Sequence, residues 1–153
     1  MNIKSTLLGL ALLFSGAAAN AGNVAIDANE NGVTLAGHDV VAYFTENKPV
    51  EGTPEISAVY NDAIYHFSST ANRDTFKANP AKYAPKYGGF CAYGASLGKK
   101  FAVDGKAFEV VDGVLYVNKN LDVYKIWVEE KADNIVKADS KWDGIKDVAA
   151  SEL

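Results

Sequence analysis

The chain opens with a continuous apolar run, and the mixed pattern of polar and apolar positions typical of a folded domain begins only after it. Lys4 precedes the apolar stretch Leu7–Phe14, and the small residues Ala19-Asn20-Ala21 follow it. A positive start, a short apolar core and an A-x-A motif are typical of a cleavable secretion signal. The run is shorter than the roughly 20 residues that a membrane span requires. We therefore expect cleavage of residues 1–21, a periplasmic or secreted location, and no membrane span afterwards.

Two later stretches, rich in β-branched and aromatic residues, are each interrupted by a pair of turn residues. The first stretch covers residues 56–67 and turns at Asn61-Asp62, and the second covers residues 107–118 and turns at Asp112-Gly113. Such pairs between apolar runs are typical of two-residue hairpin turns. The pattern therefore predicts two β-hairpins.

The first hairpin is followed by a helical pattern over Ser69–Ala78, which Ser68 or Ser69 can cap. Pro80 disfavours a helical conformation in the residue before it, so this helix must stop there and a new helical turn can begin at the proline. A further short helical turn is expected within Gly37–Phe44. Before the second hairpin, the stretch Phe90–Leu97 predicts another short helix, which Gly98 can close.

The second hairpin is followed by a longer amphipathic pattern that Asn118 or Asn120 can cap and that runs through Lys131. After it, Ile135–Trp142 is expected to dock as a short piece, and residues 143–153 are expected to form a flexible tail.

These elements predict an α+β fold, a small single domain with two β-hairpins that are each followed by a helix. We expect an irregular lead-in over residues 22–32 and the folded domain over residues 33–142. The remaining length is sufficient for one hydrophobic core.

Charge and missing motifs exclude several classes of function. One of the 15 basic residues and none of the 19 acidic residues fall within residues 1–21, so the mature chain has a net charge of −5. An acidic chain without clustered Lys and Arg is unsuited to nucleic acid. The chain contains no glycine-rich phosphate loop and no C-x-x-C-H motif. We therefore expect no nucleic acid, no nucleotide and no attached haem.

Three side chains are the soft or borderline metal ligands of the mature chain: His38, His66 and Cys91. Cys91 is the only cysteine, so an intramolecular disulfide is impossible, and the thiol can be a core residue, a metal ligand or a reactive group. His66 can be a half-buried strand residue or a ligand, and His38 can orient its Gly-His-Asp turn or act as a ligand. Together these residue types suit copper or zinc.

Several separated motifs make the sequence similar to a known family. Tyr65-His66-Phe67-Ser68, followed by Phe76, Asn79-Pro80 and Tyr83, resembles the core of the YHS domain, a small metal-associated module. Further segments resemble the stand-alone exported members of this family, and together the motifs cover roughly residues 33–142: Gly37–Phe44, Tyr87–Ala92, Asp112–Tyr116 and Asn134–Asp139.

The resemblance implies metal sensing or handling, because related modules are fused to copper-transporting ATPases and to bacterial hydroxylases. In those relatives one cysteine follows the strand phenylalanine and a second lies four residues later. Ser68 and Asn72 occupy these positions here. With that pair absent, Cys91 is the only thiol that could be a direct ligand, and His66 and His38 are the imidazoles that could join it.

Three functions follow from these observations. The first is binding or handling of a transition metal of the copper or zinc class. The second is a non-catalytic module that binds a small ligand or a protein partner, with an aromatic cleft formed by tyrosines that could equally form a core: Tyr43, Tyr65, Tyr83, Tyr87 and Tyr93. The third is a thiol-based redox enzyme that uses Cys91. No base with an orienting partner is visible, so we expect no catalysis.

The signal makes a prediction about processing. Cleavage after Ala21 should leave Gly22 as the new N-terminus of the exported protein. The intact mass of protein recovered from the exporting compartment tests this directly. An exported species that retains residues 1–21 would contradict both the signal and the location.

Overall fold

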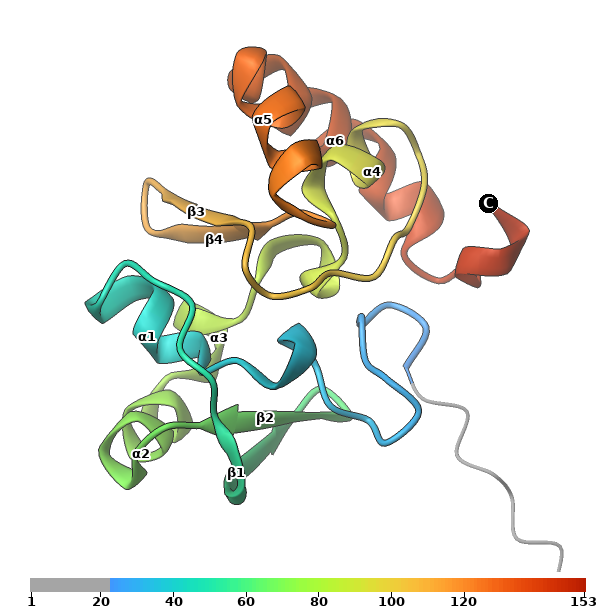
Figure 1. Ribbon diagram of the computed structural model, residues 1–153. Helices are drawn as coiled ribbons and strands as arrows, with labels where there is room; N and C mark the ends of the chain where they lie inside the picture. The colour runs from blue at the N-terminus through green and yellow to red at the C-terminus, as the bar shows by residue number, and fades with distance from the viewer. Residues whose placement is uncertain (1–22) are drawn as a thin grey trace, which may run out of the picture.

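Both predicted turn pairs form hairpins in the computed structural model, which describes residues 23–153 (Figure 1). The two hairpins are separate two-stranded antiparallel sheets, with these strands: β1 (Thr53–Tyr60) with β2 (Ala63–Phe67), and β3 (Phe108–Val111) with β4 (Val114–Val117). The α+β prediction is confirmed. The predicted signal, residues 1–21, lies outside the described residues.

The turns close in the left-handed conformation that their residue types favour. Asn61 and Asp62 have φ values of 49° and 62°, and Asp112 and Gly113 have values of 50° and 78°. Two consecutive positive φ values match the right-handed twist of the flanking strands, which is why Asn, Asp and Gly are preferred there. The turns therefore set the register of both hairpins.

The helices that follow the first hairpin begin and end as the sequence predicts. α2 (Thr70–Ala78) starts after Ser69, whose hydroxyl accepts a hydrogen bond from the Asn72 amide at 3.1 Å. Pro80 then starts α3 (Pro80–Tyr83) at its first helical position. The turn expected near residue 40 is α1 (Val40–Thr45).

The middle of the chain is more irregular. The helix expected before the second hairpin is α4 (Ala92–Ser96), and three short 3₁₀ turns lie elsewhere: Leu35–Gly37, Lys86–Gly89 and Ala150–Glu152. Within residues 23–153, no helix has both the length and the apolar composition to cross a membrane.

The helix predicted through Lys131 ends two residues early, at Glu129, and a second and longer helix starts directly after a break at Glu130. α5 (Leu121–Glu129) is capped by Asn120, and α6 (Lys131–Ile145) follows after Glu130 leaves the helical conformation at φ −127° and ψ 45°. The break turns α6 back against α4, where Ala138 is fully buried. α6 therefore contains the piece expected as a separate docking segment, and it continues into the segment predicted as a flexible tail.

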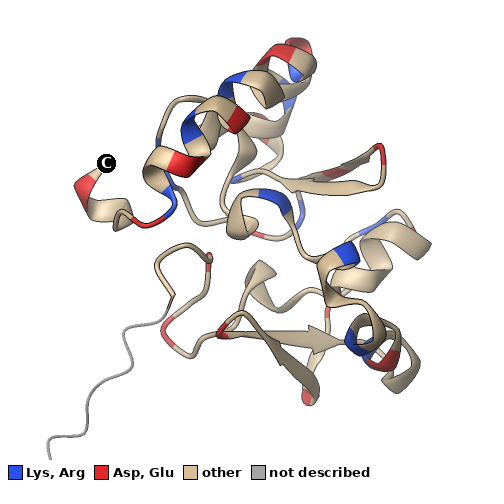
Figure 2. Ribbon diagram, turned by 180° about the vertical axis from the view of Figure 1, so that it is seen from behind, with Lys and Arg blue, Asp and Glu red and all other residues tan. Residues whose placement is uncertain are grey.

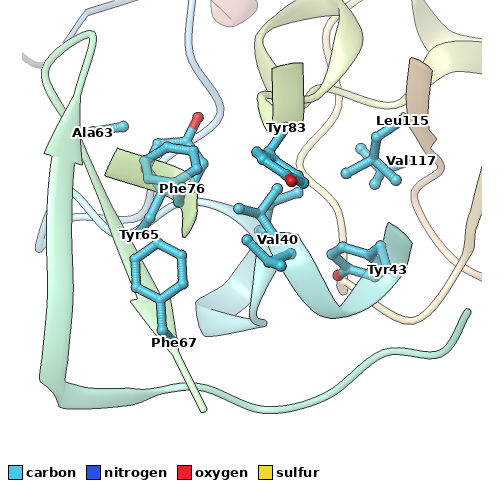
Figure 3. Close-up of a cluster of buried hydrophobic side chains, with 11 residues drawn as sticks. Val40, Tyr43, Ala63, Tyr65, Phe67, Phe76, Tyr83, Leu115 and Val117 are labelled. Carbon is cyan, nitrogen blue, oxygen red and sulfur yellow. The ribbon is translucent and has the colours of Figure 1, made fainter. Parts of the chain in front are cut away.

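The core consists of two clusters, and the second hairpin contributes to both of them. The first cluster packs β2, α1, α2 and α3 against Leu115 and Val117 of β4 (Figure 3). The second cluster surrounds the fully buried Trp127. Burial of large apolar side chains is the main stabilising contribution in such a fold.

The predicted aromatic cleft is not formed by its tyrosines. Tyr43, Tyr65 and Tyr83 are buried in the first cluster, and Tyr87 is buried in the second. Tyr93 packs against the second cluster while remaining partly exposed. These side chains are therefore core residues, which is the usual outcome where aromatic residues are dense.

The N-terminal segment, residues 23–33, docks against both halves of the fold (Figure 1). It passes so close to Gly88 that a Cβ at this glycine would lie 1.8 Å from the Ala25 carbonyl oxygen. The Asp27 amide donates to the Gly88 carbonyl at 2.8 Å, and the Lys100 ammonium donates to the Val24 carbonyl at 2.7 Å. The segment that was expected as an irregular lead-in is therefore held at defined points.

The close approach at Gly88 leads to a stability prediction. Gly88→Ala should lower the free energy of unfolding by about 3 kcal/mol, because it adds a steric clash to the strain of a left-handed residue. Gly113→Ala is the matched control, since Gly113 also has a positive φ but a Cβ added there would meet nothing within 4 Å. The control should lose only about 1 kcal/mol in urea denaturation. Equal losses would contradict the docking of the N-terminal segment over Gly88.

Candidate functional site

Cys91 lies just before α4 and acts as its cap. Its sulfur accepts a hydrogen bond from the Gly94 amide at 3.4 Å, and its thiol donates to Oδ1 of Asn118 at 3.5 Å. The side chain is 1 % exposed, and burial raises the pKa of the thiol, although the Gly94 amide opposes this effect. A raised pKa disfavours the thiolate that metals and redox partners require. These contacts fit a structural thiol better than a metal ligand.

Asn118 makes structural hydrogen bonds to Cys91 and Tyr93 that the sequence did not predict. The sequence offers Asn118 and Asn120 as equivalent caps for α5, and the structure uses Asn120. Asn118 is fully buried, and its Oδ1 also accepts a hydrogen bond from the Tyr93 amide at 3.1 Å. Asn118 thereby joins the end of β4 to the start of α4 and fixes the position of Cys91.

His38 is also held by protein groups. It is 6 % exposed, and Nδ1 donates to the Leu35 carbonyl at 3.0 Å, because a carbonyl oxygen can only accept. The backbone of Gly105 passes directly against the ring, where a Cβ would lie 2.3 Å from Nδ1. These contacts orient the turn that precedes α1.

Ser68 and Asn72, which lie where the resemblance to the YHS domain would place two cysteines, converge on one carboxylate oxygen. Oδ2 of Asp39 accepts hydrogen bonds from the Ser68 hydroxyl at 2.7 Å and from the Asn72 side-chain amide at 2.8 Å. It also accepts one from the Ser68 amide at 2.8 Å. Asp39 is fully buried, and its other oxygen caps α1 through the Val41 and Ala42 amides. Ser68 and Asn72 therefore have a structural role, because they satisfy the fully buried carboxyl group of Asp39.

His66 differs from the other two predicted ligands because it borders a hollow. It lies on β2, opposite Ser57 in the register of the hairpin, and is half-buried. Two glycines make room around it. A Cβ at Gly37 would lie 3.5 Å from Nδ1 of His66, and a Cβ at Gly52 would lie 2.5 Å from the His66 carbonyl carbon. The backbone bond from the Gly52 amide to the Gly37 carbonyl, at 2.9 Å, holds the two glycines together.

The space beside these glycines, which we call the His66 hollow, has a volume of about 560 Å³. Its walls come from the N-terminal segment and the turn after it, from Glu51 and Gly52, from β2 and from a loop at residues 102–103. Its ionisable groups are His66, Glu51 and Asp27. The volume lies within the range of small-molecule sites. Segments distant in the sequence therefore meet at a space that could hold a small ligand.

Asp27 is the most perturbed acid of the hollow. Its Oδ2 accepts a hydrogen bond from the Val103 amide at 3.0 Å, which ties the N-terminal segment to the opposite loop. Burial raises the pKa of its carboxyl group from 3.8 to about 6, although this hydrogen bond opposes the shift. Such perturbed acids in clefts are frequent at functional sites. The sequence did not single out Asp27 as a site residue, because Asp27 lies within the segment expected to be an irregular lead-in.

The structure places Cys91, His38 and His66 in three different sets of contacts. No hydrogen bond among the described residues joins any two of the three. Within residues 23–153, no three His, Cys, Asp or Glu side chains are grouped so that they could hold one metal ion. Metal coordination by Cys91, His66 and His38 stays a prediction.

Comparisons of the chain with protein-family models, with curated proteins and with solved structures gave no match.

The burial of Asp27 predicts a pH-dependent effect on stability. Above about pH 6 the folded protein carries a charge that burial disfavours by up to about 3 kcal/mol, whereas below about pH 4 the carboxyl group is protonated in both states. Asp27→Asn removes the charge and keeps an acceptor for the Val103 amide. The variant should therefore gain stability over the wild type as the pH rises from about 4 to 6. Urea denaturation across this range measures the difference, and a difference independent of pH would contradict the burial of a charged Asp27.

Proposed function

We propose that this protein is an exported, non-catalytic binding module that holds a small ligand in the His66 hollow. The observation that carries the proposal is the convergence of His66, Glu51 and Asp27, from separate parts of the chain, on a space of about 560 Å³. Binding sites are typically concave, with a few polar groups that orient the ligand. Gly37 and Gly52 line the hollow beside His66, and a Cβ at Gly52 would lie 2.5 Å from the His66 carbonyl carbon.

Binding is better supported than catalysis. Among the described residues, no hydrogen bond joins His66 to Glu51 or Asp27, so the hollow lacks a base with an orienting carboxylate. A redox role for Cys91 requires access to the thiol, and this side chain is 1 % exposed.

Export is part of the proposal and rests on the signal-like sequence of residues 1–21. The N-terminal segment begins just after the expected cleavage site and supplies one wall of the hollow. Cleavage after Ala21 would leave that wall complete.

Binding of a copper or zinc ion is the second candidate. It rests on His66 alone in the hollow, because Asp27 and Glu51 line the same space but are not grouped with His66 so that the three could hold one ion. Imidazole and carboxylate are both zinc ligands, and imidazole is also a copper ligand. The resemblance to the YHS family points in the same direction. If a metal ion binds in the hollow, His66 would be its central ligand, whereas the sequence predicted Cys91 for that role because it is the only thiol in the chain.

A panel of small solutes tests both candidates. Mature protein is titrated with organic cations, organic anions, neutral alcohols, Zn²⁺ and Cu²⁺, and amide proton–nitrogen NMR spectra locate the response. We expect at least one class to shift the amides that line the His66 hollow. Ala102→Trp, at the rim of the hollow, should abolish that response, whereas Ala81→Trp on the exposed face of α3 should preserve it.

The outcomes separate the candidates. No response at these amides to any class would refute the binding site. A response to Zn²⁺ or Cu²⁺ alone, lost in His66→Ala, would favour the metal ion as the ligand. Metal retention lost in Cys91→Ser but kept in His66→Ala would instead favour a site at Cys91.

A further inference from the structure

The charged groups around the His66 hollow have one sign. Asp27 and Glu51 are its acidic residues, and neither Lys nor Arg is among the described residues that line it. Figure 2 shows acidic positions and no basic ones along the N-terminal segment, whereas basic and acidic positions are mixed on helices such as α6. The hollow therefore offers hydrogen-bond acceptors and negative charge to a ligand.

Asp27 is a half-buried carboxyl group with a hydrogen-bond partner for only one of its two oxygens. Its Oδ2 is bonded to the Val103 amide, and Oδ1 has no hydrogen bond to any described residue. None of the ion pairs among residues 23–153 includes Asp27. A partly buried charge without a counter-ion is destabilising, and a cation that enters the hollow would relieve this cost.

Part of the wall of the hollow is apolar. Val33, Ala36 and Ala102 contribute hydrocarbon surface, beside the polar side chains of Asn29 and Asn31. The volume of about 560 Å³ far exceeds a single ion and suits a molecule of several heavy atoms. An alkyl chain could therefore lie on the apolar wall while a charged end faces the acids.

We propose that the His66 hollow recognises a small organic ammonium group, with Asp27 as its counter-ion and Glu51 as a second source of negative charge in the hollow. This inference rests on the proposed ligand-binding function and names the ligand class. The ammonium N–H groups would donate to Oδ1 of Asp27, and the attached carbon chain would contact Val33 and Ala102. Hydrogen bonds to a charged partner are stronger than those between neutral groups, so the charge of the ligand should control affinity.

Three probes with the same carbon chain test the role of charge. Mature protein is titrated with n-butylammonium, n-butanol and butyrate at about pH 7.5, where the amine is protonated and the acid is ionised. Amide NMR spectra should show shifts around the hollow for n-butylammonium, with an affinity about tenfold or more above that of n-butanol, and no such shifts for butyrate.

Asp27→Asn should weaken n-butylammonium binding about tenfold or more, as expected for the loss of a charge-assisted hydrogen bond. The matched control is Asp62→Asn, because Asp62 is an exposed acid on a neighbouring hollow and does not line the His66 hollow. It should leave the affinity unchanged. The far-ultraviolet circular dichroism and the unperturbed amide signals of both variants should match the wild type.

Several results would overturn the inference without refuting the ligand site. These are equal or tighter binding of n-butanol or butyrate at the same amides, binding of Zn²⁺ alone, or undiminished n-butylammonium affinity in Asp27→Asn. Failure of every solute to shift these amides would refute the site and the ligand class together.

Discussion

One buried carboxylate holds together the part of the fold that carries the candidate site. Asp39 is fully buried and its two oxygens accept five hydrogen bonds, from the first turn of α1 and from Ser68 and Asn72. A buried charge is tolerable only where donors are held in place around it, and the loss of one donor costs about 1–3 kcal/mol. Because Ser68 follows β2 directly, this network also fixes the strand end that positions His66.

The extent to which sequence predicts this structure depends on how local each determinant is. Asn61-Asp62, Asp112-Gly113 and Pro80 act within a few residues of themselves, so both hairpins and the boundary between α2 and α3 could be predicted. The start of α6 directly after Glu130 could not be predicted, because it depends on packing of α6 against a distant helix. The role of Asp27 could not be predicted for the same reason, since its hydrogen-bond partner Val103 lies 76 residues away.

The three predicted ligands differ in how deeply each is buried and in how far the protein already satisfies its polar atoms. The thiol of Cys91 and Nδ1 of His38 have hydrogen-bond partners in the protein, both side chains are almost fully buried, and neither lines the His66 hollow. His66 has room around it because Gly37 and Gly52 bring backbone close without adding side chains. Polar groups that border such a space remain available for recognition, whereas groups already satisfied by the protein mainly stabilise it.

The docking of the N-terminal segment has a consequence for the order of folding. Residues 23–33 leave the ribosome before the rest of the domain, yet their anchors, Gly88, Lys100 and Val103, are synthesised much later. Contacts this distant in sequence require long loops to close, so they form slowly and only after their partners exist. A nascent chain that lacks its second half therefore cannot form the His66 hollow. The hollow is assembled only when the first segment closes over loops made from the second half of the domain.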